Sequence, residues 1–206
     1  MDDSFSLHEG HALDLIDNFD KKLDLVVTDP PYALTGSGAE HAVSSAVACV
    51  LRETAKKLAT GSWMVVFSAS SWRSISYMTE SVRGILSPVR VANWVKPKAH
   101  TAVRTPGWSW TTVTLIAMRK GKRNNPELVA PPNINDWLEC APMTKTRRAQ
   151  LPPQVAEWAV APYIVPGGVF LDPFAGSGAL PAAAARLGMN AHGFEINPPN
   201  QEKTDG

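Results

Sequence analysis

Four consecutive residues after an apolar run are of types that could hold a small chemical group in a fixed position. In the stretch VVTDPPYAL, Asp29, Pro30, Pro31 and Tyr32 follow the apolar strand residues. A loop that only changes direction more often uses Gly, Asn or a single Pro, because each proline removes a backbone donor. Two successive prolines restrict Asp29 to an extended conformation and stiffen the loop. The stretch is therefore typical of a loop that presents a carboxylate and an aromatic ring in fixed positions.

A second stretch, GGVFLDPFAGSGALPAAAARLG, runs from an apolar strand through a glycine turn into an alanine-rich helix. A tight bend with free N–H groups at the carboxyl end of a strand is where open α/β sheets bind nucleotides. Glu195 lies about 19 residues after Gly176, where a carboxylate can accept hydrogen bonds from ribose hydroxyls. Pro181 replaces the third glycine of a dinucleotide motif, which favours a nucleoside ligand. A tight turn without a ligand is the alternative at this point.

The order TDPPY, LDPFAGSG, GFEIN resembles that of the β-class amino-methyltransferases, S-adenosylmethionine-dependent enzymes that methylate exocyclic amines of DNA bases. The resemblance spans residues 5–197 and is weakest between 97 and 153. It implies a Rossmann-like α/β fold with a mixed, mostly parallel seven-stranded sheet, circularly permuted because the catalytic tetrapeptide precedes the cofactor glycines. It also implies S-adenosylmethionine as the cofactor and DNA as the partner. The implied cofactor-binding residues are Asp172, Pro173, Phe174, Gly176, Ser177, Gly178, Glu195 and Ile196.

The resemblance gives the stiff loop a chemical role. The amine of adenine or cytosine is a poor nucleophile because its lone pair is delocalised into the ring. The Asp29 carboxylate and the Pro30 carbonyl can accept its two N–H groups and draw the nitrogen towards tetrahedral geometry. Tyr32 offers a face on which an extruded base can stack. Residues 33–41 either close over the base as a lid or only connect to the next helix, and the structural alternative for Asp29 is a turn-capping acid.

Within this family a tetrapeptide that begins with Asp is usually associated with adenine, so adenine N6 is favoured as the target. The alternatives are cytosine N4, an RNA substrate, and a catalytically silent methyltransferase-like subunit that binds nucleic acid. A carbon-5 cytosine methyltransferase would need a nucleophilic cysteine, and neither Cys49 nor Cys140 has the sequence context for that role.

Short β-branched runs alternate with helical patterns, which predicts a single α/β domain over residues 1–206 with a mainly parallel sheet. The expected strands are 5–8, 25–28, 64–68, 89–95, 113–118, 169–172 and 191–195. The expected helices are 12–19, 40–59 and 179–187, and Gly188 ends the last of them. Residues 124–153 predict a loop, and residues 97–148 are expected to hold a short target-recognition insertion.

Basic residues gather in the middle of a chain whose formal net charge is only +1. Residues 81–126 contain nine lysines and arginines and no acidic residue. This distribution favours a polyanionic partner, although a solvated surface would explain any single one of these residues. The residues expected to contact DNA are Lys96, Lys98, Arg104, Arg119, Lys120, Lys122, Arg123, Arg147 and Arg148.

Two positions depart from the family pattern. His11 follows Gly10 where relatives carry an acid that contacts the cofactor's adenine, so His11 either substitutes for that contact or lies at the surface. Leu151 stands between Gln150 and Pro152 where relatives carry a lysine. Because the lysine is absent at position 151, the sequence does not predict which residue forms that part of the cofactor pocket.

The cysteines, the first ten residues and the length of the apolar runs limit the class of protein further. Two cysteines far apart, without CxxC spacing or a neighbouring His, are read as buried or incidental thiols of a reducing compartment, and no metal site is expected. The start MDDSFSLHEG lacks the basic and apolar regions of a leader, and the apolar runs are short. A cytoplasmic location without a membrane partner is therefore expected. A homodimer and a restriction endonuclease partner remain open.

Overall fold

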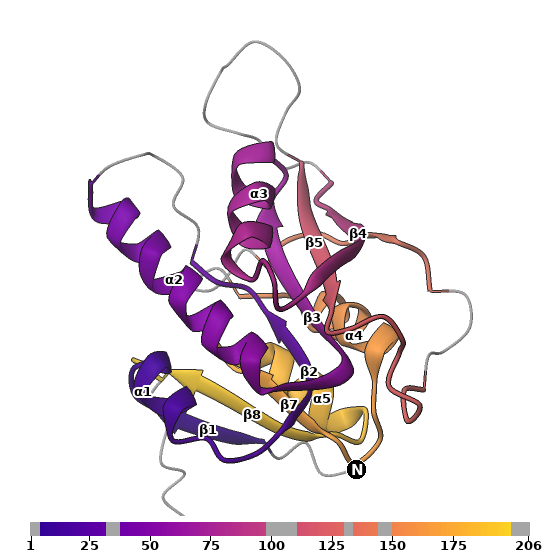
Figure 1. Ribbon diagram of the computed structural model, residues 1–206. Coiled ribbons are helices and arrows are strands. Elements are labelled where there is room, and N and C mark those ends of the chain that lie inside the picture. Colours follow the sequence, from indigo (N-terminus) through magenta and orange to yellow (C-terminus); the bar gives the residue numbers. More distant parts are fainter. Residues whose placement is uncertain (1–4, 32–37, 98–110, 130–133, 144–149, 199–206) are drawn as a thin grey trace, which may run out of the picture.

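The computed structural model of the 206-residue chain describes residues 5–31, 38–97, 111–129, 134–143 and 150–198, with the side chains of 38–44 excepted (Figure 1). The strands are β1 (Ser6–Glu9), β2 (Leu23–Thr28), β3 (Leu58–Ala69), β4 (Ser87–Val95), β5 (Thr112–Arg119), β6 (Trp137–Glu139), β7 (Val169–Asp172) and β8 (Asn190–Glu195). The helices are α1 (Ala12–Asp17), α2 (Gly38–Lys57), α3 (Trp72–Ser81), α4 (Pro153–Val160) and α5 (Ala179–Arg186), and a 3-10 turn (Ala161–Tyr163) follows α4.

These strands form one eight-stranded sheet in the order β1-β8-β7-β2-β3-β5-β4-β6. β5 pairs antiparallel with both β3 and β4, whereas all other neighbouring pairs are parallel. Seven strands therefore point the same way, and their carboxyl ends share one edge of the sheet. That shared edge is where an open α/β sheet binds its ligands.

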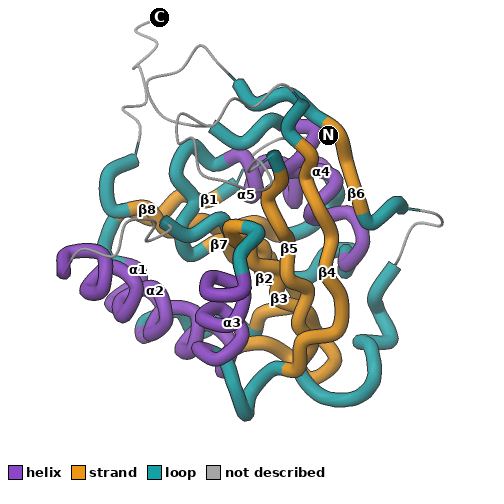
Figure 2. Tube along the Cα trace, turned by 90° about the horizontal axis from the view of Figure 1, so that it is seen from above, coloured by secondary structure: helices purple, strands orange, loops and turns teal. Residues whose placement is uncertain are grey.

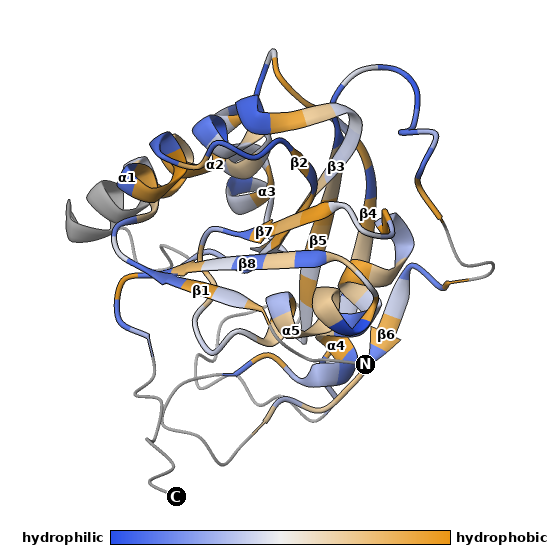
Figure 3. Ribbon diagram, turned by 90° about the horizontal axis from the view of Figure 1, so that it is seen from below, coloured by the Kyte–Doolittle hydropathy of each residue, from blue (hydrophilic) through white to orange (hydrophobic). Residues whose placement is uncertain are grey.

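Helices cover both faces of the sheet (Figures 2 and 3). Helices α1, α2 and α3 pack on one face, against Val26 and Leu171 among others, and α4 and α5 pack on the other, against Leu25 and Phe170. These four strand residues are wholly buried. Neighbouring residues of β2 and β7 thus enter two different cores, which explains why these strands are apolar almost throughout and not alternating.

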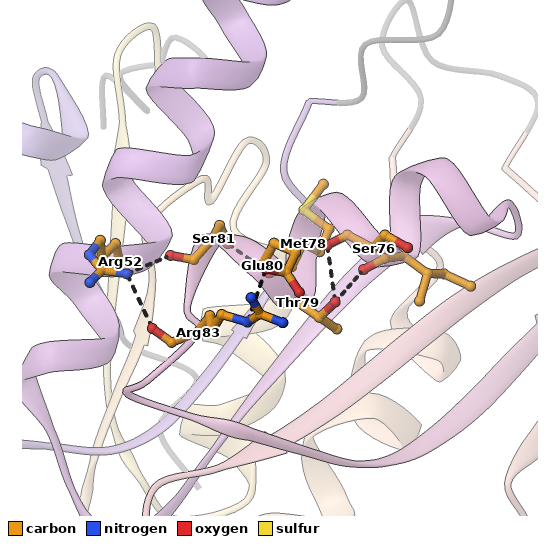
Figure 4. Close-up of polar contacts among 8 residues, drawn as sticks. Arg52, Ser76, Met78, Thr79, Glu80, Ser81 and Arg83 are labelled. Atoms are coloured by element: carbon orange, nitrogen blue, oxygen red, sulfur yellow. Dashed lines mark hydrogen bonds and ion pairs between the residues drawn. The ribbon is translucent and has the colours of Figure 1, made fainter.

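Cations stabilise the C-terminal ends of two helices, where backbone carbonyls lack intrahelical partners. Arg52 of α2 donates from Nη1 to the carbonyls of Ser81 and Arg83 at 3.3 and 3.4 Å, which ties α2 to the end of α3 (Figure 4). Lys120 donates from Nζ to the carbonyls of Ala55, Lys56 and Leu58 at the end of α2, over distances of 2.7–3.2 Å.

Strand β1 lies at the edge of the sheet, and a contact between two histidine rings joins it to β8. The Nε2 of His8 lies 3.2 Å from the Nδ1 of His192 in β8, and the Nζ of Lys21 lies 3.0 Å from the Nε2 of His192. Burial, followed by the charges of Lys21 and His8, lowers the pKa of His192 to about 4. The ring is therefore neutral near pH 7, and its Nε2 can accept a hydrogen bond from the Lys21 ammonium, which places the ring proton on Nδ1.

The α/β class and the mostly parallel sheet are confirmed, but the sheet has eight strands and not seven. The additional strand, β6, lies in the segment 124–153 that was predicted to be a loop. Helix α2 ends at Lys57, and β3 starts at Leu58, six residues before the predicted strand. Helices α3 and α4 were not predicted. Gly188 does follow α5 with a φ of 86°, as a C-terminal glycine should.

Candidate active site at the carboxyl edge of the sheet

Four neighbouring strands end side by side at the carboxyl edge, and each has an acidic residue there. Asp172 ends β7, Glu195 ends β8, Glu9 ends β1 beside Glu195, and Asp29 follows β2. These ends surround a cavity of about 540 Å³, which is within the usual size of a small-molecule site. Its lining includes His11, Asp29, Pro31, Phe174, Glu195 and Ile196, with Ala46, Val47 and Val50 from α2.

Asp172, which belongs to the glycine-turn motif, is a buried carboxyl group that contacts the strand of the other motif. Its Oδ1 accepts hydrogen bonds from Thr28 Oγ1 at 2.6 Å and from the Phe174 backbone N–H at 3.0 Å. Burial raises the pKa of Asp172 to about 7; the two hydrogen bonds oppose this shift, and the charges of Asp29 and Glu195 add to it. The Thr28 contact joins the strand that ends in the Asp29 loop to the strand that ends in the glycine turn.

Replacement of Asp172 by Asn is expected to flatten the pH dependence of stability. The folded protein keeps this proton up to about pH 7, whereas the unfolded chain loses it near the ordinary value of 3.8. The free energy of unfolding therefore falls as pH rises between these values, by about 3 kcal/mol from about pH 5 to about pH 8. Asp172→Asn should lose that part of the slope in urea denaturation at several pH values. Equal slopes for the two proteins would contradict the assignment.

The glycine turn is tied to the end of β8 through Glu195. Glu195 Oε2 accepts the Gly176 N–H at 2.8 Å, and Oε1 accepts the Asn197 N–H at 3.0 Å. Gly176 and Gly178 have φ values of 53° and 83°, which side chains other than hydrogen disfavour. Glu195 thus holds the turn in addition to facing the cavity. A carboxylate has about four acceptor positions, so these two bonds leave room for ligand hydroxyls.

His11 lies on the cavity wall and also begins a helix. It is the N-cap of α1, and its Nδ1 accepts the Leu13 N–H at 3.3 Å. The preceding Gly10 donates its N–H to the Glu195 carbonyl at 3.1 Å, which joins the ends of β1 and β8. In the neutral ring the proton is then on Nε2, so His11 can offer a donor to a ligand only from that atom.

The structure brings the main predicted residues together at this edge. Asp29, Pro31, Pro173, Phe174, Glu195, Ile196 and His11 all line the cavity. Pro30 is buried beside them, and Ser177 is exposed on the turn. Tyr32 and the loop 33–37 lie outside the described residues, as do the side chains of 38–44.

The predicted DNA-contacting residues divide between two edges. Lys96 directly follows β4 at the carboxyl edge, with its ammonium 5.6 Å from the centre of the Trp94 ring. Arg119, Lys120, Lys122 and Arg123 lie at the opposite edge, because β5 runs antiparallel and ends there. Arg119 donates to Asn124 Oδ1 and to the carbonyls of Gly121 and Lys122. Lys98, Arg104, Arg147 and Arg148 lie outside the described residues.

Some site residues were missed by sequence reasoning. Thr28 was read as the end of a strand, although it donates to Asp172. Ala46, Val47 and Val50 were read only as part of a helix, although they line the cavity. Val50 follows Val47 by three residues and Ala46 by four, and this spacing marks one helix face. The sequence does not say that this face covers a ligand cavity and not only the core.

Other kinds of site find no support in the described parts of the chain. Within them, no three His, Cys, Asp or Glu side chains come together in a way that could hold a metal ion. No helix among the described residues is long and apolar enough to cross a membrane. Cys49 is exposed on α2 and Cys140 is half-buried after β6, so neither is a core thiol.

Comparisons with known proteins match the chain to one protein family and to several solved structures. Residues 23–203 match the N6/N4 family model described as DNA methylase. Similar solved structures include a protein assigned as a DNA modification methylase from Thermus thermophilus, complexed with S-adenosyl-L-methionine (23% identity, TM-score 0.72, covering 94% of this chain and 88% of that one). No curated protein matches the sequence.

Two further solved structures have a similar fold. The M1.HpyAVI-SAM complex is 21% identical with a TM-score of 0.70, and the match covers 94% of both chains. The cytosine-N4-specific PvuII DNA methyltransferase is 17% identical with a TM-score of 0.72, and the match covers 93% of this chain and 82% of that one. At these identities the structural matches establish the fold alone.

Proposed function

Because the chain belongs to the DNA methylase family of N6/N4 amino-methyltransferases, we propose that it transfers a methyl group from S-adenosylmethionine to adenine N6 in DNA. The observation that carries this proposal is the shared cavity: Asp29 and Glu195, which belong to two motifs far apart in the sequence, line the same space. The motif order, with Asp29 before the glycine turn, supports assignment to the permuted β class.

The cavity has the size and the chemical lining that S-adenosylmethionine requires. A Cβ built on Gly176 meets nothing within 4 Å, so the turn leaves open space next to the Glu195 carboxylate. Ile196 is 56% exposed and, with Phe174, offers an apolar surface to a nucleobase. Two of the solved structures of this fold contain S-adenosylmethionine. When bound, the cofactor supplies a methyl group carried on a positively charged sulfur.

We assign the ribose hydroxyls to Glu195 and the base amine to the Asp29 loop. The Asp29 carboxylate and the Pro30 carbonyl accept the two amine hydrogens, and the prolines hold both acceptors in place before the base arrives. Tyr32 stacks on the extruded base. The bound cofactor would supply its methyl group directly to the amine nitrogen and leave as S-adenosylhomocysteine, and the Asp29 carboxylate, which accepts one amine N–H, would pass that proton to solvent. The chain therefore needs no nucleophilic side chain, and its own contribution is positioning.

Substrate DNA must approach the carboxyl edge, where Asp29 lies. Lys96 stands at this edge, and we assign it to the phosphate backbone together with Lys98, Arg104, Arg147 and Arg148. Arg119 and Lys120 have structural partners at the other edge, so we leave the group of Arg119, Lys120, Lys122 and Arg123 out of this surface. Segments of 97–148 that lie outside β5 and β6 are our candidates for target recognition.

Mass spectrometry of nucleosides tests this function. The purified protein is incubated with S-adenosylmethionine and, in separate reactions, with unmethylated genomic DNA or with total RNA, and each nucleic acid is then digested. N6-methyladenine is the expected product. N4-methylcytosine alone would correct the base and keep the mechanism, and no methylated nucleoside in DNA or RNA would favour a silent binding subunit.

A further inference from the structure

One large aromatic side chain projects from the carboxyl edge and takes no part in the cavity. Trp72, the first residue of α3, is 83% exposed, the highest value among the large apolar side chains described. Single exposed apolar residues are common on proteins and need no explanation by themselves. The position of Trp72 makes it informative, because α3 begins just after β3, the strand next to β2 and its Asp29 loop.

The register of β2 and β3 sets how far Trp72 projects. Thr28, the last residue of β2, pairs with Val66, and β3 continues to Ala69. Three extra strand residues carry the chain about 10 Å further at ~3.3 Å per residue. Trp72 therefore stands on a rim beyond the level of Asp29, where β3 has ended and α3 begins. This rim belongs to the same edge of the sheet at which DNA would present a base to Asp29.

The backbone that carries Trp72 is held by a network of hydroxyl groups. Ser70 Oγ lies 2.9 Å from Thr114 Oγ1 and donates to the Thr112 carbonyl at 3.1 Å, which ties the end of β3 to β5. Thr114 Oγ1 in turn donates to Asn93 Oδ1 of β4 at 3.2 Å. Ser71 caps α3 by accepting the Ser74 N–H at 3.2 Å. The rim is thus fixed before any partner binds, which lowers the entropy lost on binding.

The charges beside Trp72 suit a polyanion. Arg73 is its neighbour in α3 and is exposed, and Lys96 follows β4 at the same edge. An aromatic face with adjacent cations is the combination that binds unstacked bases and their phosphates without regard to sequence.

We propose that Trp72 stacks on a base of the substrate DNA strand next to the base held at Asp29, with Arg73 on the adjoining phosphate. The inference rests on the proposed function for the location of the reacting base. It adds a DNA contact outside both family motifs. Stacking of this kind keeps the strand open while the target base is extruded, so it should act on DNA affinity and not on cofactor affinity.

Fluorescence anisotropy with a labelled random-sequence single strand tests the contact. Trp72→Ala is expected to weaken binding about 5- to 140-fold, because loss of one stacked base costs ~1–3 kcal/mol. Trp72→Phe should restore most of the affinity, and calorimetry should give the same S-adenosylmethionine affinity for both variants. Val89→Ala, at an exposed apolar residue near the start of β4, is the control and should bind as the wild type does.

A matched pair of arginines tests the phosphate contact. Arg73→Ala should reduce the slope of log affinity against log salt by about 0.7. Arg83→Ala, at the other end of α3 where Arg83 pairs with Glu80, should leave the slope unchanged. Affinity within twofold of wild type in Trp72→Ala, with methyl transfer intact, would overturn this inference alone. Loss of affinity in Trp72→Ala in a protein that methylates nothing would uphold the contact and reject the proposed function.

Discussion

Asp29→Ala should lower the rate of methyl transfer by about 10²–10³-fold or more, the usual cost of removing one preorganised acceptor or donor from a reacting centre. The variant loses the charged acceptor assigned to the base amine, and the Pro30 carbonyl alone cannot hold both hydrogens. Asp29 lies after β2, whereas Glu195, the acceptor assigned to the ribose, lies at the end of β8. S-adenosylmethionine affinity should therefore stay within a few-fold of the wild type.

Single-turnover methylation and calorimetry separate these two effects. Asp29→Asn, which keeps the shape and one neutral acceptor, should fall between the wild type and Asp29→Ala. Asp20→Ala is the matched control, because Asp20 is exposed in the loop before β2, at the opposite edge. Near-normal turnover in Asp29→Ala would remove the proposed mechanism, whatever the cofactor affinity.

The two glycines of the turn should respond to substitution in different ways. A Cβ on Gly178 would overlap the Phe5 ring, and the residue has a φ of 83°. Gly178→Ala should therefore lower the free energy of unfolding by about 2–4 kcal/mol, from backbone strain and overpacking together. A Cβ on Gly176 meets open space, so Gly176→Ala should cost about 1–2 kcal/mol of strain and act mainly by placing a methyl group where the cofactor binds.

Urea denaturation and cofactor calorimetry of both variants distinguish the two roles. Phe5→Ala should cost little further stability in the Gly178→Ala background, because the substituted ring is the one that the new Cβ displaces. The sequence motif puts both glycines against the cofactor, whereas the Phe5 contact argues against that role for Gly178 and leaves it to Gly176. A Gly178→Ala variant as stable as Gly176→Ala would contradict the packing argument.

The sequence predicts the α/β class and which motif residues meet at one edge of the sheet, but it does not reveal every helix and strand. Asp29 directly follows one apolar strand, Asp172 and Glu195 end two others, and parallel strands bring their carboxyl ends to one edge. The local motifs therefore predict a spatial site without knowledge of the packing. β6 is only three residues long, and α3 has the weakly helical sequence WRSISYMTES. Elements of this kind form because of tertiary contacts, so local propensity does not reveal them.

The basic cluster shows a different limit of sequence reasoning. Lys96 and Arg119 stand 23 positions apart in a segment without acids, and they were read as one surface. The antiparallel direction of β5 carries Arg119 to the opposite edge from Lys96. Lys120 there serves the end of α2. Closeness in sequence does not give closeness in space where a strand reverses.

The pairing of β1 with β8 has a consequence for folding kinetics. His8 and His192 are 184 positions apart, and Thr28 and Asp172 are 144 apart, so half of the sheet depends on contacts of very long range. The β2-β3-β5-β4 half needs only nearer partners, and such contacts form earlier. During synthesis, the Asp29 loop therefore emerges long before β8, the strand that completes the cavity. Pulse-labelling hydrogen exchange should show protection of Val65 before that of Leu171.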